Sequence, residues 1–599
     1  MGTCSYRQEE WHLECQKEIW GGSGEFCIFH DPSPEKNVDL FKEKLEEQMK
    51  SETREQNFIG YYFPKNWDFL DADFSRTPFQ GTATFFGAAF QKADFRGATF
   101  QGTATFFGAA FQKADFRRVT FQGEANFMKT DFQEADFRAA TFQGTADFWD
   151  ATFPNANFND TAFQDAEFTE ATFLSTANFR AATFQGTATF LRTTFQKAEF
   201  VKTTFHRANF SGVAFQEAEF EGATFQGTAD FWDATFLEAN FNDTIFEEAD
   251  FRGSTFQGNA DFVKATFQGD ADFSGVTFHR ANFRGATFQE SNFNDITCQG
   301  AHFNETTFNK RATFVKATFQ GTADFMMATF QDADFEGATF KRADFRWTNF
   351  KNAYFRNITV NQSFDFCPES VSEMIDFQES KFLFSGSITV NLEKARFRRA
   401  YLQNVDFIDC KWPDNYTIFE ESNEDLSFNE LETIYRNLKQ SMQHHGNYTT
   451  AGEFYYREME CRKKSMRKTM FSFNWPKSYV YSLLKYTCGY GERPSRVIGV
   501  SLLIILFSAL FFQYSGIVMG EHTIEERVID HEILVAFPTL QSINDYLQCV
   551  YYSFVTFTTL GYGDIHPLGY SKVIACAESF AGAFFIALFV LVFGRKMMR

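Results

Sequence analysis

Phenylalanine recurs every five residues through the middle of the chain, from about Phe69 to Phe355. A small residue usually stands two places before each phenylalanine, and polar residues such as Gln, Arg and Glu follow it. A five-residue period matches neither the 3.6-residue repeat of an amphipathic helix nor the two-residue alternation of a strand. It predicts a square coil with one five-residue unit per side, in which the phenylalanine and the small residue point inward.

Some steps in this array are six residues long, as in QGTATF at 80–85 and QGTADF at 143–148 and 226–231. Early in the array, three five-residue steps and one six-residue step make a period of 21 residues. We expect each extra residue to form a bulged corner of the coil.

The pattern, which raises the phenylalanine count to 85, resembles the pentapeptide-repeat family in its phenylalanine-centred form. The resemblance implies a right-handed quadrilateral β-helix over residues 65–410, in which each coil hydrogen-bonds to the next. About 14 coils at the strand spacing of about 4.8 Å predict a rod on the order of 65–70 Å long. Cys298 replaces phenylalanine at one centre, and a degenerate tail continues to about Phe407.

The sequence leaves the role of this rod open. We expect a scaffold or spacer, or a domain that senses a signal or docks an unknown cytosolic partner. Some members of the resembled family are acidic rods that imitate DNA, and the net charge of −21 permits that use. Lys and Arg recur along the repeats, however, and dilute the acidic field. We therefore expect no nucleic-acid partner.

Two apolar segments near the C-terminus have the length of membrane-spanning helices. The run 497–518 carries no charge, and a second span is predicted over 571–594, with Glu578 inside its apolar run. About 20 apolar residues suffice to cross a bilayer. Between the spans, residues 543–557 predict a short amphipathic helix, and the string TTLGYGD follows at 558–564.

This order of helix, re-entrant helix, TTLGYGD loop and helix resembles the pore of the two-helix potassium channels, over roughly the last 105 residues. The resemblance implies four copies around one axis, because a single filter strand cannot surround an ion. It also implies that backbone carbonyl oxygens replace the hydration shell of K⁺. The implied selectivity filter comprises Thr559, Leu560, Gly561, Tyr562 and Gly563.

The same resemblance assigns supporting roles around the filter. Thr558 and Asp564 flank it, and Asp564 is expected to brace it against the preceding helix. Many family members have Val where this chain has Leu560; its carbonyl faces the ion, so selectivity is still expected. Gly561 and Gly563 permit the backbone angles that turn successive carbonyls inward. A second GYG, at 489–491, lacks such flanks and is interpreted as a turn.

Two residues of the second span have two interpretations each. Glu578 supports the filter through a hydrogen bond to the pore helix or takes a direct part in gating, since charges inside spans are usually functional. Gly582 lies where such channels often bend on opening, which makes it a hinge candidate. Close helix packing is the alternative.

Charge predicts the orientation in the membrane. Arg493 and Arg496 precede the first span, and the second is followed by further basic residues. Positive flanks stay inside, so both termini are expected in the cytoplasm. We expect no signal peptide, and ten scattered cysteines fit a reducing compartment. The basic residues after the second span are Arg595, Lys596 and Arg599, and the acidic loop between the spans carries Glu521, Glu525, Glu526, Asp530 and Glu532 against Arg527.

The first 35 residues contain Cys4, Cys15, Cys27 and His30. The two residues between Cys27 and His30 allow both to bind one ion, and three thiolates with an imidazole suit a closed structural Zn²⁺ site. Small buried cysteines are the alternative interpretation, and His12 can substitute as a ligand. In the next segment, 36–64, we predict an exposed amphipathic helix over 36–54 and a cap on the first coil at 61–64.

Two helices are predicted over 425–470, between the repeats and the spans. Ser427 and Glu430 have the spacing of a capping box, and 444–447 is the predicted turn. Residues 471–496 combine aromatic and basic side chains that suit the membrane interface, with core packing as the alternative. No phosphate-binding glycine loop, HExxH or nucleophile elbow is present in the sequence, and we expect no enzyme.

Together these features predict a homotetrameric, potassium-selective channel of the cell membrane with a large cytoplasmic repeat domain. Its expected partners are three further copies, the lipid and a cytosolic partner; K⁺ is the expected permeant ion. A weakly selective cation channel and a membrane-anchored interaction scaffold are the alternatives. The intact TTLGYGD string argues against both.

Overall fold

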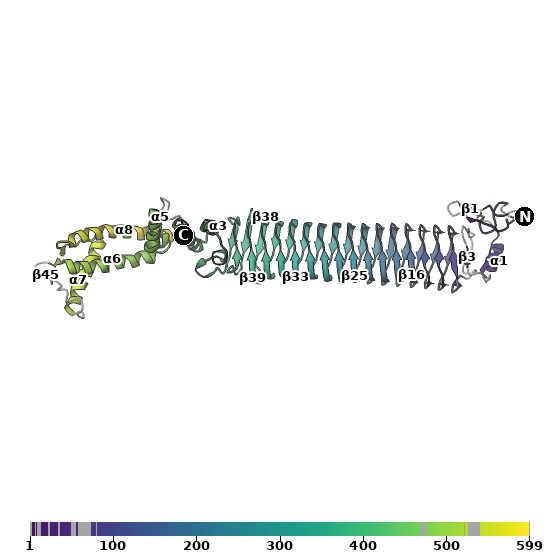
Figure 1. Cartoon of the computed structure of the whole chain (residues 1–599), viewed down its shortest axis with the longest axis horizontal. Coiled ribbons are helices and arrows are strands. Elements are labelled where there is room, and N and C mark those ends of the chain that lie inside the picture. The colour runs from purple at the N-terminus through teal and green to yellow at the C-terminus, as the bar shows by residue number, and fades with distance from the viewer. Residues whose placement is uncertain are drawn as a thin grey trace. The chain divides into compact units, whose positions relative to one another are not determined.

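Figure 1 shows the computed structural model of the chain. The chain separates into two compact units: residues 1–397 with 407–411, and residues 398–406 with 412–599. The structure describes residues 3–5, 7–8, 13–21, 24–33, 36–49, 55–57, 61, 74–79, 81–468, 475–519, 522–524 and 540–597.

The first unit is dominated by a β-solenoid of about 16 turns built from the five-residue repeats. Its strands form two long parallel sheets, in which each strand pairs with the strand one turn later. Ala110 pairs with Asp131, which confirms the period of 21 residues. The step shortens to 20 where Thr152 pairs with Thr172, because all four sides of that turn are then five residues long.

Strand length changes along the solenoid (Figure 1). The first turns have strands of two or three residues, from β4 (Pro78–Phe79) to β15 (Ala135–Asp136). Longer strands begin with β16 (Thr141–Asp147) and include β25 (Thr224–Asp230), β33 (Thr307–Thr313), β38 (Thr359–Phe366) and β39 (Ser370–Asp376). The last turns return to short strands, ending with β42 (Ala395–Arg396) and β43 (Val405–Phe407).

Phenylalanine rings fill the interior. Equivalent rings stack on successive turns, as Phe106 does on Phe127 with centroids 4.7 Å apart and planes 1° apart. Rings from neighbouring sides meet edge to face, as Phe106 meets Phe116 at 5.7 Å and 83°. Both geometries are favourable for aromatic pairs. Phe127 and Ala125 are buried, so both predicted inward positions face the core. Cys298, also buried, occupies one centre between Phe278 and Phe319.

The six-residue steps form bulges, as predicted, but within strands. In β16 the pairing register shifts between Phe142 and Thr145. The two-residue turns that follow other centres are different, since they place a residue at positive φ, as at Lys129 (52°) and Asp150 (54°). A strand absorbs the extra residue because it can leave one residue unpaired without changing the turn.

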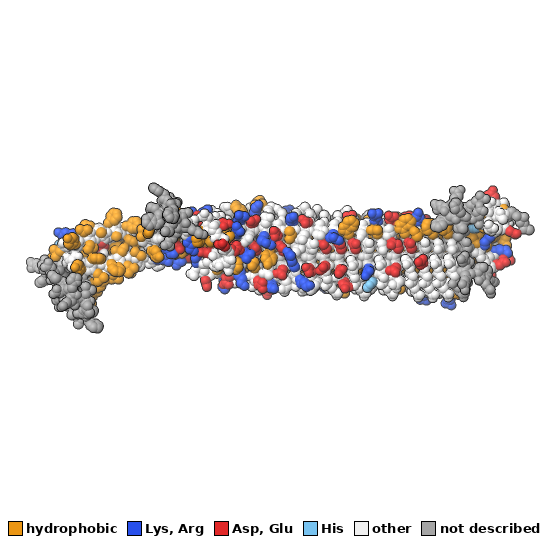
Figure 2. Space-filling model, viewed as in Figure 1, with side chains coloured by type: hydrophobic (Ala, Val, Ile, Leu, Met, Phe, Trp, Pro, Cys, Tyr) orange, Lys and Arg blue, Asp and Glu red, His pale blue; other side chains and the backbone are white. Residues whose placement is uncertain are grey.

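Acidic and basic side chains are interspersed on the solenoid surface, as Figure 2 shows for one face. Asp115 pairs with Arg117 at 2.6 Å, and Asp136 pairs with Arg138 at 2.7 Å, one turn later. Arg117 also lies 3.6 Å from Asp136 on the next turn. Exposed pairs of this kind add little stability, but they divide the acidic surface into locally compensated patches.

Before the solenoid, β1 (Arg7–Gln8) pairs with β2 (Leu13–Glu14), and α1 spans Val38–Met49. Helix α1 lies within the amphipathic helix predicted over 36–54: Phe41 and Leu45, on its apolar face, are buried, and most of its charged residues are exposed. Strand β3 (Glu55–Asn57) pairs with β5 (Thr82–Thr84). The carbonyl of Tyr61 accepts from the amide of Ala89 at 3.0 Å, in keeping with the predicted cap. Residues 50–54 and 62–64 of these predictions lie outside the described residues.

The second unit contains a helical hairpin. Its helices are α3 (Phe428–His444) and α4 (Tyr448–Lys468), preceded by η2 (Asp414–Tyr416) and α2 (Phe419–Asn423). The capping box at Ser427 and Glu430 is confirmed. Helix α3 also binds residues 398–406, since Asn437 and Ser441 donate to main-chain carbonyls there at 3.1 and 2.6 Å.

The remaining elements form the apolar end of this unit. They are α5 (Trp475–Cys488), η3 (Gly489–Gly491), α6 (Pro494–Ser515), β44 (Ile517–Met519), β45 (His522–Ile524), α7 (Leu540–Phe557), β46 (Ile565–Pro567) and α8 (Ser571–Met597). Within the part of the chain that the structure describes, α6 and α8 are the two helices long and apolar enough to cross a membrane. The second GYG forms a turn, as interpreted, with Tyr490 at φ 59°.

Helix α6 is displaced toward the N-terminus relative to the predicted span of 497–518. Pro494 begins it, since proline is favoured in the first turn of a helix. Gly516, with φ 90°, ends it. The apolar residues that follow enter β44, which pairs with β45 and β46. Hydropathy alone did not separate these strand residues from the helix.

Candidate functional site

The TTLGYGD loop begins where α7 ends. Thr558 still bonds back to this helix through its hydroxyl, which donates to the carbonyl of Phe554 at 2.7 Å. Thr559, Gly561 and Gly563 then have positive φ, at 56°, 55° and 75°. Since glycine adopts such angles without steric cost, the loop can change backbone direction at closely spaced positions. Such changes allow several carbonyls to face one side.

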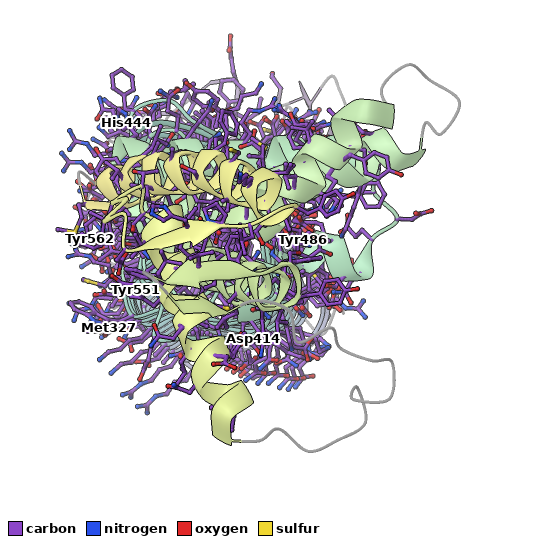
Figure 3. The ribbon with its side chains drawn as sticks, turned by 90° about the vertical axis from the view of Figure 1, so that its left-hand side faces the viewer. Met327, Asp414, His444, Tyr486, Tyr551 and Tyr562 are labelled. Atoms are coloured by element: carbon purple, nitrogen blue, oxygen red, sulfur yellow. The ribbon has the colours of Figure 1, made fainter. Side chains whose placement is uncertain are left out.

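The side chains on either side of Gly561 point away from the chain's own core. Leu560 is 55% exposed and Tyr562 is 67% exposed. Tyr562 and Tyr551, both labelled in Figure 3, line a cavity of about 280 Å³ beside the loop. In a single copy of the chain, therefore, one side of the loop is exposed and lies next to this cavity.

Asp564 closes the loop against α7. The hydroxyl of Tyr551 donates to a carboxylate oxygen of Asp564 at 3.0 Å. This bond links α7 to the last residue of the loop, so it can fix the position of the loop's end relative to the helix. The sequence motif does not identify Tyr551, because 13 positions separate it from its partner.

Glu578 lies behind the loop on α8 and is buried. Its carboxyl group meets the hydroxyl of Ser553 on α7. The same hydroxyl lies 2.8 Å from the carbonyl oxygen of Ile505 on α6. Glu578 and Ser553 thus join α6, α7 and α8.

Gly582 faces the end of α7. A β-carbon at this position would overlap the carbonyl oxygen of Phe557, the last residue of that helix. The contact is between backbones, so a side chain cannot rotate away to relieve it. Close packing, one of the two interpretations of Gly582, is therefore present here, while the hinge stays a prediction.

A second cluster lies at the other end of the chain. The ligand atoms of Cys4, Cys15, Cys27 and His30 all lie within 4.8 Å of one another. The Cys15 and Cys27 sulfurs are 3.8 Å apart, and Nδ1 of His30 lies 3.2 Å from the sulfur of Cys27 and 3.6 Å from that of Cys4. Cys4, Cys27 and His30 are buried. His12, the alternative ligand, lies outside the described residues.

Hydrogen bonds favour negative sulfur in this cluster. The amide of Cys27 lies 3.1 Å from the sulfur of Cys4, and the amide of Lys17 lies 3.5 Å from that of Cys15. A hydrogen bond from Cys27 lowers the pKa of Cys15, whereas the same contact, together with burial, raises the pKa of Cys27.

Family models match segments in each of the two units of the chain. A family model described as "Ion channel" matches residues 528–599. Models described as "Pentapeptide repeats" match residues 83–123 and 106–152 and, in overlapping segments, 190–348. The chain carries pentapeptide repeats fused to an ion-channel domain. With α6 and α8, this makes it a membrane protein.

No curated protein matches the chain. One solved structure that resembles it is HetL, a pentapeptide repeat protein involved in heterocyst differentiation regulation from the cyanobacterium Nostoc sp. strain PCC 7120. It shares 16% identity, over 47% of this chain and 93% of that one, with a TM-score of 0.13.

Proposed function

We propose that four copies of the chain form a potassium-selective channel. The observation that supports this most is the backbone of the TTLGYGD loop, with positive φ at Thr559, Gly561 and Gly563 between α7 and α8. Carbonyl oxygens of residues 559–563 replace the water around K⁺. The exposed Tyr562 and the hollow beside it are then covered by the neighbouring copies.

Charge favours a cytoplasmic position for both termini. Basic residues lie at the start of α6 (Arg493 and Arg496) and at the end of α8 (Arg595 and Lys596). Positive residues that flank membrane spans stay on the inner side of the membrane. The repeat domain then lies in the cytoplasm, where it docks a partner or regulates the pore. Accessibility of single cysteines introduced at the two termini to a membrane-impermeant thiol reagent tests this orientation.

Reversal potentials test selectivity. The purified full chain is placed in a planar bilayer with K⁺ on one side and Na⁺ on the other. Each tenfold preference for K⁺ shifts the reversal potential by about 59 mV, and we expect a shift of at least that size. A reversal potential near zero would instead identify a weakly selective cation channel. A tetramer without current would identify a membrane-anchored scaffold.

We also propose that Cys4, Cys15, Cys27 and His30 bind one Zn²⁺ per chain. Tetrahedral zinc with bonds of about 2.3 Å to sulfur and about 2.0–2.1 Å to nitrogen requires edges of about 3.8 Å between sulfurs and about 3.6 Å between sulfur and nitrogen. The observed 3.8 Å between Cys15 and Cys27 and 3.6 Å between Cys4 and His30 agree with these edges, whereas the 3.2 Å between Cys27 and His30 is shorter and would lengthen when the ion binds. A disulfide, by contrast, needs about 2.05 Å.

Elemental analysis of the purified full chain tests the zinc proposal. We expect one zinc per chain, and a loss of most of it in Cys27→Ser. Cys367→Ser is the matched control, because Cys367 is a half-buried free cysteine in the solenoid. Zinc content that is negligible in the unmodified chain, or equal in both variants, would remove the proposal.

A further inference from the structure

Helix α4 contacts the chain at two places: the residues just before α6 and the last turn of α8. Arg595, in the last turn of α8, lies with its guanidinium 5.2 Å from the ring centre of Tyr455 on α4. The same guanidinium pairs with the carboxylate of Glu492, just before α6, at 3.3 Å. Arg493, the next residue, pairs with Glu453 on α4 at 3.1 Å. We call Glu453, Tyr455, Glu492, Arg493 and Arg595 the Arg595 cluster.

Glu492 is the sheltered member of the cluster, whereas the side chains of Arg595, Arg493 and Glu453 are 39%, 42% and 35% exposed. The side chain of Glu492 is only 9% exposed. Gly491 approaches Arg595 so closely that a β-carbon there would lie 3.4 Å from its guanidinium. Ion pairs in such positions are screened much less than surface pairs. The Arg595–Glu492 pair is therefore screened less than a fully exposed pair of the solenoid such as Lys113–Glu134, which has the same separation of 3.3 Å.

A second set of contacts attaches α4 to the segment before α6. Glu460 on α4 accepts from Lys485 of α5 and from the hydroxyl of Tyr490, each at 2.6 Å. Although burial raises the pKa of Glu460, these two hydrogen bonds hold it below its usual value overall. Glu460 thus stays charged and keeps α4 in place beside the start of α6.

Helix α4 is also fixed at its other side. Glu458 accepts from Arg436 and Lys439 of α3 at 3.2 and 2.6 Å, and Arg462 pairs with Glu432 of α3 at 2.9 Å. Helix α3 in turn holds residues 398–406, the end of the repeat region. A displacement of those residues therefore moves α3 and α4 together.

We propose that the Arg595 cluster couples the α3–α4 hairpin to opening of the pore. The proposal rests on the proposed channel function. Helix α8 runs without interruption from Ser571 to Met597, so a shift of its last turn shifts the helix behind the TTLGYGD loop. That turn cannot move away from α6 or α4 without separating Arg595 from Glu492 or Tyr455. Any signal that repositions the hairpin thereby changes the balance between open and closed pores.

Single-channel recording of the full chain tests the coupling. Glu492→Gln and Arg595→Gln each remove one charge of the Arg595–Glu492 pair. We expect both to change the open probability in the same direction, by at least about fivefold, the lower end of usual coupling between sites. Conductance and K⁺ selectivity stay unchanged, since neither residue lines the filter. Lys596→Gln, which removes an exposed charge from the same turn, is the matched control.

Three further variants separate coupling from simple anchoring. Tyr455→Phe keeps an aromatic face for Arg595 and should behave as the unmodified chain, whereas Tyr455→Leu should resemble Arg595→Gln. Glu492→Arg combined with Arg595→Glu restores opposite charges and should reverse most of the effect of the single changes. Open probabilities equal to that of Lys596→Gln, or additive effects in the double variant, would overturn the proposal.

Hydrogen exchange gives a second measurement that does not depend on current. Arg595→Gln should increase exchange at the α4 amides around residues 453–460, and Lys596→Gln should not. Unchanged exchange in α4 would overturn the coupling even in a protein that passes no current. If the unmodified chain does not select K⁺ over Na⁺, by contrast, that result would count against the proposed channel function.

Discussion

Gly561 and Gly582 are both required to be glycine in the channel domain, for different physical reasons. Gly561 has a φ of 55° and open space where a β-carbon would stand, so only its backbone angle excludes other residues. At Gly582 there is no space for a side chain, because a β-carbon would overlap the Phe557 carbonyl. The motif identified Gly561 from sequence. It could not decide the role of Gly582, whose partner lies 25 positions earlier and is found only through packing.

Gly561→Ala should abolish current and leave the tetramer assembled. A β-carbon makes the left-handed backbone unfavourable by about 1–2 kcal/mol per residue, repeated in each of four copies, so the carbonyls turn away from the axis. Planar-bilayer recording together with size-exclusion chromatography checks both parts. Persistent K⁺-selective current would contradict the assignment of the filter.

Gly582→Ala should lower stability, because α8 must move off α7 to admit the methyl group. Overpacking of this kind costs about 1–3 kcal/mol. Thermal unfolding of the purified protein measures the loss. Gly594→Ala is the matched control on the same helix, since its β-carbon meets nothing within 4 Å. Equal melting temperatures in the two variants would be inconsistent with the observed contact.

At the scale of elements, the phenylalanine period predicted the solenoid well because each turn repeats the same local packing problem. The period defined the inward positions, the 21-residue step and the existence of bulges. Helix α5 was predicted only as an interfacial segment, although Tyr479, Val480, Leu483 and Tyr486 are exposed on it at helical spacing. Their mixture of aromatic and aliphatic types near basic residues concealed the helix period.

Phe236→Asp should open the solenoid locally. Phe236 is fully buried between Phe215 and Phe256, with ring centroids 5.0 and 4.6 Å away. An unpaired charge there costs about 3–5 kcal/mol, and a solenoid responds mainly in the neighbouring turns. Limited proteolysis with mass spectrometry should find new cleavage near residue 236. Leu237→Asp, at the exposed next position, should be cleaved like the unmodified chain.

At the scale of the whole molecule, charge is divided unequally along the chain. Nearly all of the net charge of −21 lies before Arg398, in the N-terminal segment and the repeats. The ion pairs on the solenoid compensate this charge only locally, since acidic residues remain in excess. The sequence shows this division directly, but it cannot say how near the acidic repeats come to the pore, because that depends on how four copies assemble.

The distance between the repeats and the pore can be measured through conductance. Acidic surroundings raise the local K⁺ concentration, and salt screens the effect over roughly 8–10 Å. We expect the full chain to have a higher K⁺ conductance at low salt than a chain beginning at Arg398, which keeps the second unit intact. At high salt the two conductances should converge, because the field no longer reaches the pore entrance. Equal conductances at low salt would place the repeats beyond the screening distance, and the repeats would then act through the hairpin and a docked partner alone.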